Sequence, residues 1–123
     1  MSKILICGLG SIGERHAQNL LNLGYNDLIV YRFNNRPIRN KSLSNLKIYT
    51  NIKKALQEKP SVAFICNITH KHMDTSIICA KSGIHLFIEK PISNNLKKIK
   101  KLEYFVKKNK LKVMVGYMMR FHP

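Results

Sequence analysis

The chain has 123 residues, 45% of them hydrophobic and 23% charged, with 22 lysines and arginines against 6 aspartates and glutamates. This length suits one domain, and the apolar content is that of a globular chain rather than a disordered one. No apolar run approaches the ~20 residues that span a bilayer, and the four apolar residues before Gly8 are too few for a signal peptide. We therefore expect a soluble, cytoplasmic protein with no membrane partner.

The formal net charge of +16 is large enough to attract nucleic acid or another polyanion. Eight lysines lie within residues 97–112, where helical spacing puts Ile99, Leu102 and Phe105 on one face and most lysines outside it. This pattern is typical of a solvated outer helix, and no nucleic-acid motif accompanies it. We therefore do not expect nucleic acid as a partner.

The three cysteines, Cys7, Cys66 and Cys79, each stand inside an apolar stretch. Their number is odd and their spacing is not that of a metal site. A thiol in such a stretch behaves as a small hydrophobic group. We therefore expect reduced thiols in the core and no metal.

Short apolar runs alternate with segments of helical spacing along most of the chain. Strands this apolar, separated by helices, are typical of a parallel sheet covered on both faces. We therefore predict a doubly wound, mostly parallel α/β sheet of the Rossmann type in a single domain, with a turn-prone segment from Arg32 to about Asn45. The predicted strands are 3–7, 27–31, 46–50, 62–66, 85–89 and 112–116; the predicted helices are 12–23, 51–59, a segment between the loop 67–72 and Gly83, and the lysine-rich segment capped by Ser93 or Asn94.

Three glycines follow the first predicted strand in the stretch "GLGSIG", residues 8–13. In a strand-turn-helix unit Gly8 makes the tight turn, Gly10 leaves room for a pyrophosphate, and Gly13 lets the helix press on the sheet. Main-chain amides at the start of that helix suit an anion. A purely structural turn is the alternative, and the triphosphate loop G-x-x-x-x-G-K-[ST] does not occur. The predicted phosphate-binding residues are Gly8, Leu9, Gly10, Ser11, Ile12 and Gly13.

Arg32 stands at the end of the second predicted strand, where an NAD-binding unit of this type carries an acidic residue. A guanidinium cannot accept hydrogen bonds from the ribose hydroxyls, but it can pair with a 2′-phosphate. We therefore predict that the cofactor is NADP or NAD, with NADP favoured. The alternative is that Arg32 is a loop residue facing solvent.

Four stretches occur in chain order: "GLGSIGERHAQNL" at the glycine loop, "NITHKH" after the fourth strand, "FIEKPIS" at the fifth, and "VGYMMRFHP" at the end. Together they resemble the N-terminal domain of the Gfo/Idh/MocA family of oxidoreductases, which includes glucose-fructose oxidoreductase and inositol dehydrogenase. The resemblance implies that residues 1–123 are one NAD(P)-binding Rossmann domain. In that family the lysine of the glutamate-lysine-proline motif lies beside the nicotinamide and contacts the substrate or helps to move its proton. The resemblance makes Lys90 the catalytic residue, and places at the cofactor Asn67, Thr69, His72, Glu89, Lys90 and Arg120.

The alternative to a catalytic role for Lys90 is that it is an ordinary surface lysine. Lysine, with a reference pKa of about 10.4, is a poor base unless burial or a neighbouring cation lowers its pKa. In an extended segment Glu89 and Lys90 point to opposite sides, so the carboxylate need not hold the ammonium charged. His72 has an alternative as a loop or helix-start histidine, and we expect His16 to pack or cap along the first helix.

Two features depart from the family pattern. Ile68 stands where proline is usual, which leaves the loop after the fourth strand less rigid. Family members continue into a C-terminal substrate-binding domain, and this sequence ends at Pro123, where that domain is expected to begin. We therefore expect the isolated chain to bind cofactor and to turn over weakly or not at all.

The resulting hypothesis is an NAD(P)-binding domain that serves hydride transfer between a nicotinamide cofactor and a sugar, polyol or nucleotide-sugar hydroxyl. The expected partners are a small sugar-like substrate and either a second copy of the chain or a separately encoded substrate domain. The alternative is a non-catalytic nucleotide-sensing or partner-binding Rossmann module, for which an apolar surface at residues 117–121 would be the interface.

Overall fold

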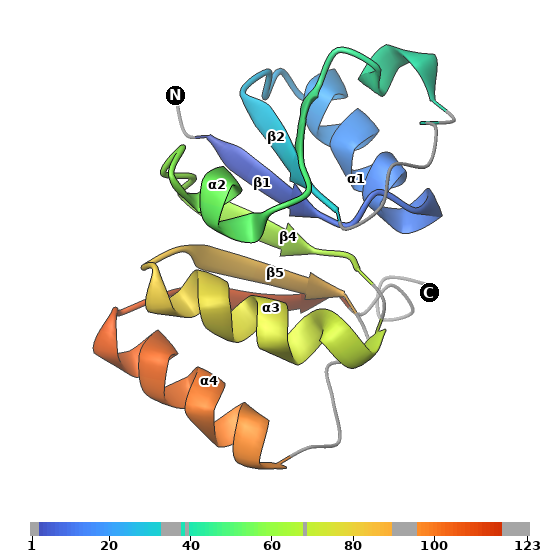
Figure 1. The fold of residues 1–123 in the computed structure, drawn as a ribbon. Coiled ribbons are helices and arrows are strands. Elements are labelled where there is room, and N and C mark those ends of the chain that lie inside the picture. Colours follow the sequence, from blue (N-terminus) through green and yellow to red (C-terminus); the bar gives the residue numbers. More distant parts are fainter. Residues whose placement is uncertain (1–2, 33–37, 39, 68, 90–95, 117–123) are drawn as a thin grey trace.

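The computed structural model describes residues 3–32, 38, 40–67, 69–89 and 96–116, with the main chain alone for residues 69 and 70. In this part of the chain six parallel strands form one sheet in the order β3-β2-β1-β4-β5-β6, with helices on both faces (Figure 1). The elements are β1 (Ile4–Cys7), α1 (Ser11–Asn22), β2 (Leu28–Tyr31), the 3-10 helix η1 (Lys41–Leu43), β3 (Lys47–Tyr49), α2 (Ile52–Leu56), β4 (Val62–Ile65), α3 (Thr69–Lys81), β5 (His85–Glu89), α4 (Leu96–Lys108) and β6 (Val113–Gly116).

The strand order reverses direction between β1 and β4. The chain runs outward from β1 through β2 to β3, returns to pair β4 with the other side of β1, and then continues outward through β5 to β6. In such a sheet the carboxyl ends of β1 and β4 face a crevice that the connecting segments leave open. The loop 8–10 after β1 and residues 66–67 after β4 therefore meet at this switch point.

Two hydrophobic clusters hold the helices to the two faces of the sheet. On one face, Ile6 and Val30 of the sheet pack with Ala17 and Leu20 of α1. On the other face, the sheet packs against α2, α3 and α4. The clusters separate because successive side chains of a strand point to opposite faces. Figure 1 shows α3 and α4 side by side on one side of the sheet and α1 across from them. The second cluster includes Leu5, Cys7, Ala55, Ile65, Met73, Ile77, Ile88 and Leu102.

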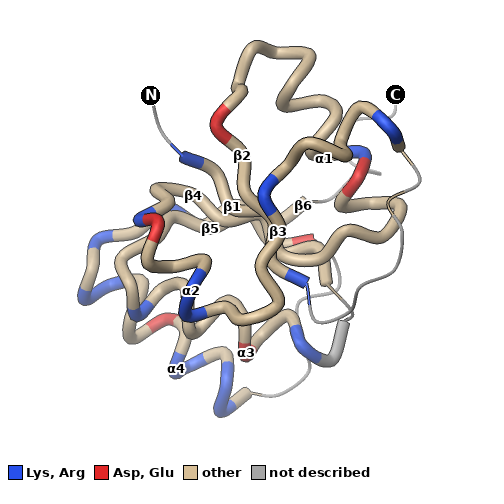
Figure 2. Tube along the Cα trace, turned by 45° about the horizontal axis from the view of Figure 1, so that its top comes forward, with Lys and Arg blue, Asp and Glu red and all other residues tan. Residues whose placement is uncertain are grey.

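The lysine-rich helix α4 is a surface helix, as its periodicity predicts. Leu102 is buried, and Ile99, Phe105 and Val106 are half-buried against the core. Figure 2 shows that basic positions gather along α4, whereas acidic positions are scattered. The exposed lysines of α4 are Lys97, Lys100, Lys101, Lys107 and Lys108.

The predicted Rossmann-type sheet is confirmed; β5 has the predicted bounds, and the other five strands are one or two residues shorter than predicted. The predicted loop 67–72 is wrong, because α3 already begins at Thr69. The polar segment after β2 contains η1, which was not predicted. The Asn40 side chain caps η1 by accepting from the Ser42 amide at 3.0 Å. The predicted helix 51–59 is shorter, because α2 ends at Leu56, the amides of Glu58 and Lys59 donate three residues back rather than four, and Lys59 takes a positive φ of 55°. Among the described residues no helix is long and apolar enough to cross a membrane.

Candidate cofactor site at the switch point

The turn after β1 needs glycine at position 8. Gly8 has a φ of +97°, a region that side chains of L-residues rarely adopt, and its amide donates to the carbonyl oxygen of Tyr31 at 2.8 Å. A Cβ on Gly8 would stand 2.6 Å from the Cα and amide nitrogen of Asn67. The turn is therefore pressed against the backbone that leaves β4, and only glycine fits both requirements.

The third glycine brings α1 against this turn. A Cβ on Gly13 would stand 3.0 Å from the carbonyl carbon of Gly8 and would overlap the carbonyl oxygen of the same residue. Gly13 is also on the buried stripe of α1, together with Ala17 and Leu20. The predicted packing role of Gly13 thus agrees with the geometry.

The middle glycine borders open space. Among the described residues, a Cβ on Gly10 would meet no atom within 4 Å, and Ser11 and Ile12 are exposed. Gly10 precedes the first residue of α1, and no side chain among the described residues caps the first amides of this helix. Uncapped amides at a helix N-terminus carry a partial positive charge and attract anions. Leu9, by contrast, is buried on the α1 face of the sheet, so it contributes packing and main chain only.

Arg32 follows β2 directly, on the strand next to the glycine turn. Its amide donates to the Tyr49 carbonyl at 2.9 Å, which holds its main chain to β3. Its side chain is half-buried, and its Nε is buried with no hydrogen-bond partner among the described residues. A buried unpaired donor is costly, and an acceptor at this edge of the sheet would satisfy it.

Asn67 lies on the other side of the glycine turn. Its Nδ2 donates to Thr75 Oγ1 at 2.8 Å, whereas its Oδ1 is buried without a partner in the described part of the chain. His72 is 3% exposed, and its Nε2 lies 2.5 Å from the Asn67 carbonyl oxygen. His72 therefore contacts the main chain that backs the turn, on the first half of α3. Asn67 Oδ1 is therefore, after Arg32 Nε, a second buried polar atom without a hydrogen-bond partner among the described residues.

Glu89 ends β5, and its carboxylate turns toward α1. His16 Nε2 lies 2.5 Å from Glu89 Oε1, with side chains 16% and 13% exposed. His16 was expected to pack or cap along its own helix, and its contact with Glu89 of β5 was not predicted. A signal existed in the pattern, because Phe87 and Glu89 share a face by strand alternation and His16 follows Gly13 by one helical turn.

The remaining predicted site residues lie outside what the structure describes in full. Lys90 and Arg120 are outside the described residues, as are Ile68 and the segment 117–121. Thr69 is the first residue of α3, and only its main chain is described. The predicted site residues with described side chains therefore belong to the glycine turn, to the residues after β2 and β4, to the first half of α3, and to the end of β5.

The thiols near the crevice are held in the protonated form. Burial raises the pKa of Cys66 to about 12, and the negative charge of Glu89 adds to the effect. A hydrogen bond with Cys79 and burial raise the pKa of Cys7 as well. Such thiols are poor nucleophiles at neutral pH. Among the described residues no group of three His, Cys, Asp or Glu side chains is arranged to hold a metal ion.

A tight glycine turn at the switch point of a parallel sheet, followed by an uncapped helix N-terminus, defines a dinucleotide-binding Rossmann domain. Comparison with known families agrees with this class. The chain belongs to the GFO_IDH_MocA family, described as an oxidoreductase family with an NAD-binding Rossmann fold, whose model matches residues 2–117. The family resemblance expected from the four sequence stretches is thereby confirmed.

Individual relatives are longer than this chain. It is 33% identical over 127 aligned positions to myo-inositol 2-dehydrogenase of Thermotoga maritima, covering 97% of this chain and 37% of the relative. The crystal structure of myo-inositol 2-dehydrogenase from Lactobacillus plantarum superposes with a TM-score of 0.83 at 25% identity, covering 98% of this chain and 38% of that one. The WlbA dehydrogenase from Bordetella pertussis, crystallised with NADH and UDP-GlcNAcA, gives a TM-score of 0.86 at 15% identity, over 99% and 38% of the two chains, and shows the shared fold alone.

Proposed function

We propose that this chain binds NADP or NAD as the cofactor domain of an oxidoreductase. The observation that carries the proposal is the open space beside Gly10, between two glycines that are packed against main chain. A diphosphate in that space would meet the first amides of α1, including those of Ser11 and Ile12, and the helix dipole would favour its charge. The family description as NAD-binding supports the same ligand.

In this proposal Arg32 binds the adenosine end of the cofactor. Its orphaned Nε and its half-buried position after β2 suit a 2′-phosphate better than ribose hydroxyls. NADP is therefore the favoured cofactor. On the other side of the turn, the buried Oδ1 of Asn67 would accept a hydrogen bond from the cofactor. We also assign Thr69 and His72, in the first half of α3, to the cofactor.

The chemistry of the proposal is oxidation of a carbinol to a carbonyl group, in which hydride leaves the carbon that bears the hydroxyl and a proton leaves the hydroxyl oxygen. The bound nicotinamide supplies the hydride acceptor, and a side chain must take the proton from the oxygen. Lys90, the residue after Glu89, is the group that we assign to this step. Arg120 is assigned to the cofactor or substrate, as the family pattern implies.

The substrate class in this proposal is a sugar, polyol or nucleotide-sugar hydroxyl. The 33% identical relative is named for oxidation of myo-inositol, which supports a polyol. The chain spans 37% of that relative. We expect weak turnover or none by residues 1–123 alone, because substrate positioning supplies much of the rate, and we propose a second copy of the chain or a substrate-binding domain as its partner. We also propose that the protein is located in the cytoplasm, a reducing compartment in which free thiols such as those of Cys7 and Cys79 stay reduced.

Isothermal titration of the purified chain with NADPH and NADH tests the proposal. We expect saturable binding of at least one, tighter for NADPH, and a loss of about tenfold or more in Gly10→Glu, which puts a carboxylate into the diphosphate space. Position 10 is open and has an ordinary φ of −80°, so this variant keeps the fold. Asn45→Glu, which adds the same charge at an exposed site, is the matched control. No saturation with either cofactor at millimolar concentration refutes the proposal.

A further inference from the structure

One histidine of α1 and one glutamate of β5 form a contact between residues 73 positions apart in the chain. Both side chains are largely withdrawn from water, and His16 Nε2 lies within hydrogen-bond distance of Glu89 Oε1. A carboxylate in this position needs a donor, because burial without one is costly. His16 supplies it by donating its Nε2 proton.

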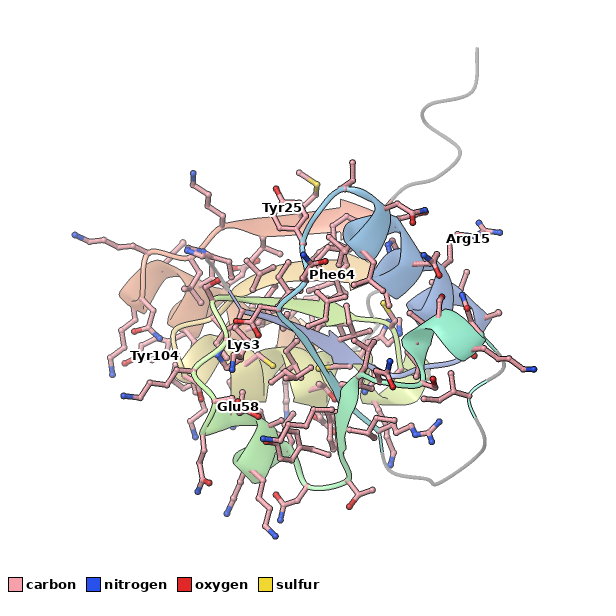
Figure 3. All side chains as sticks on the ribbon, turned by 90° about the horizontal axis from the view of Figure 1, so that it is seen from above. Lys3, Arg15, Tyr25, Glu58, Phe64 and Tyr104 are labelled. Carbon is pink, nitrogen blue, oxygen red and sulfur yellow. The ribbon has the colours of Figure 1, made fainter. Side chains whose placement is uncertain are left out.

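The imidazole ring of His16 packs against a pair of stacked phenyl rings. Its centroid lies 5.3 Å from the ring of Phe64 and 5.3 Å from that of Phe87, and the two phenyl rings stack at 4.9 Å. Phe64 on β4 points to the same face of the sheet as α1, as Figure 3 also shows. Aromatic contacts of this kind favour the position in which the imidazole faces Glu89.

The other end of the pair is shaped by a glycine on the neighbouring strand. Gly116 is in register with Glu89, and a Cβ on Gly116 would stand 3.3 Å from Glu89 Oε1 and 3.0 Å from Phe87 Cζ. A side chain at position 116 would thus press on both residues. Residues of β4, β5 and β6 therefore pack closely around the pair.

The pair joins the two halves of the sheet at the crevice. His16 belongs to the helix whose first amides border the open space at Gly10, and that helix packs on β1 and β2. Glu89 is the last residue of β5, and Lys90 follows it in the sequence. Neither α1 nor β5 needs this contact to form its own hydrogen bonds, so its effect lies in how the two are placed relative to each other.

We propose that His16 and Glu89 are a positioning pair that fixes the end of β5 against the cofactor helix and thereby sets where the nicotinamide half of the cofactor is received. This rests on the proposed cofactor function. In this arrangement the Glu89 carboxylate is engaged by His16 rather than by the cofactor. The pair then affects the nicotinamide end, while the diphosphate and adenosine end depends on the glycine turn and Arg32.

The test compares whole cofactors with fragments that lack nicotinamide. The full chain and its Glu89→Leu and His16→Leu variants are titrated with NADH and ADP-ribose, and with NADPH and 2′-phospho-ADP-ribose. We expect either variant to bind the whole cofactors about tenfold more weakly, whereas its affinity for the fragments stays within about twofold of the parent's. The reason is that the remaining partner is buried without its hydrogen bond, so the end of β5 is no longer fixed against α1. Glu89→Gln keeps an acceptor for His16 and restores binding to within about threefold of the parent. Glu103→Leu, the same type of change at an exposed site of α4, is the control.

Each outcome separates the pair from the site as a whole. An equal loss for cofactors and fragments makes the pair a stabilising contact only and overturns the inference, and so does no loss for either. Failure of the parent chain to bind any of the four ligands refutes the proposed function instead. If Glu89→Leu does not fold, Gly116→Ala gives the same test with both partners present, because its Cβ presses on Glu89; unchanged selectivity between NADH and ADP-ribose in that variant overturns the inference.

Discussion

Replacing Gly8 by alanine tests whether the glycine turn is required by its surroundings. The new Cβ would stand 2.6 Å from two backbone atoms of Asn67, 0.4 Å short of the 3.0 Å that real Cβ atoms keep. These atoms belong to the backbone after β4, so the strands or the turn must move. A positive φ in a non-glycine residue costs about 1–3 kcal/mol, and crowding in a packed site adds about 1–3 kcal/mol.

Gly24 provides the control that separates the two costs. Its φ of +95° is almost the same as that of Gly8, but a Cβ there would meet no atom within 4 Å in the part of the chain that the structure describes. Gly24→Ala should therefore carry the backbone cost alone and leave cofactor binding unchanged. Gly8→Ala should be less stable than Gly24→Ala by about 1–3 kcal/mol, or roughly 4–12 °C in Tm, and should bind NADPH at least about tenfold more weakly.

The assay is thermal and urea unfolding followed by circular dichroism, together with titration of NADPH into the folded variants. The difference between the two variants isolates the contact with Asn67, because their backbone strain is matched. Equal Tm values for Gly8→Ala and Gly24→Ala would refute the reasoning that the turn is pressed against β4. Normal NADPH binding by Gly8→Ala would separate the turn from the phosphate site.

Three further predictions concern charge and reactivity. Arg32→Gln should shift the ratio of NADH to NADPH affinity by about tenfold toward NADH, measured by titration, and an unchanged ratio would assign Arg32 to solvent. The contacts of Glu58 with Lys3, Tyr49 and Lys47 lower the pKa of its carboxyl group to about 2, and Figure 3 shows Lys3 close to Glu58. Ionised Glu58 therefore stabilises the folded state above its ordinary pKa of 4.5, and this stabilisation is lost as the pH falls from about 5 toward 2. The slope of Tm against pH in that range should flatten in Glu58→Gln, and an unaltered slope would contradict the pairing. Cys66, with its pKa raised to about 12, should react with a thiol reagent at pH 8 far more slowly in the folded chain than in urea, and equal rates would show that it is accessible as a thiolate.

The sequence predicted those parts of the protein that depend on neighbouring residues. Continuous apolar runs such as 4–7 and 62–65 indicate strands that are covered on both faces, and the sheet has them at its centre. The spacing of Gly8, Gly10 and Gly13 predicts a turn and a helix start, because only glycine permits the φ of that turn and the close approach of the helix. These requirements act within a few residues, so they are visible in the sequence.

Helix boundaries were predicted less well because they depend on capping contacts. The segment 67–72 contains Asn, Thr and His, which are common in loops, and was predicted as a loop. In the fold α3 starts at Thr69, and His72 is buried with its side chain on the Asn67 main chain. The 3-10 helix at 41–43 is likewise capped by a side chain, that of Asn40.

By itself, the sequence determined the class of fold, the glycine turn and the family, because each follows from local spacing or from residues in fixed order. Only the tertiary structure decided that His16 meets Glu89 and that Arg32 and Asn67 each hold a buried polar atom without a partner in the described chain. Those facts depend on which strands become neighbours and on how closely α1 packs against them. The reversal of strand order between β1 and β4 brings residues far apart in the chain to one edge of the sheet, and strand order is a property of the packed core rather than of any short stretch.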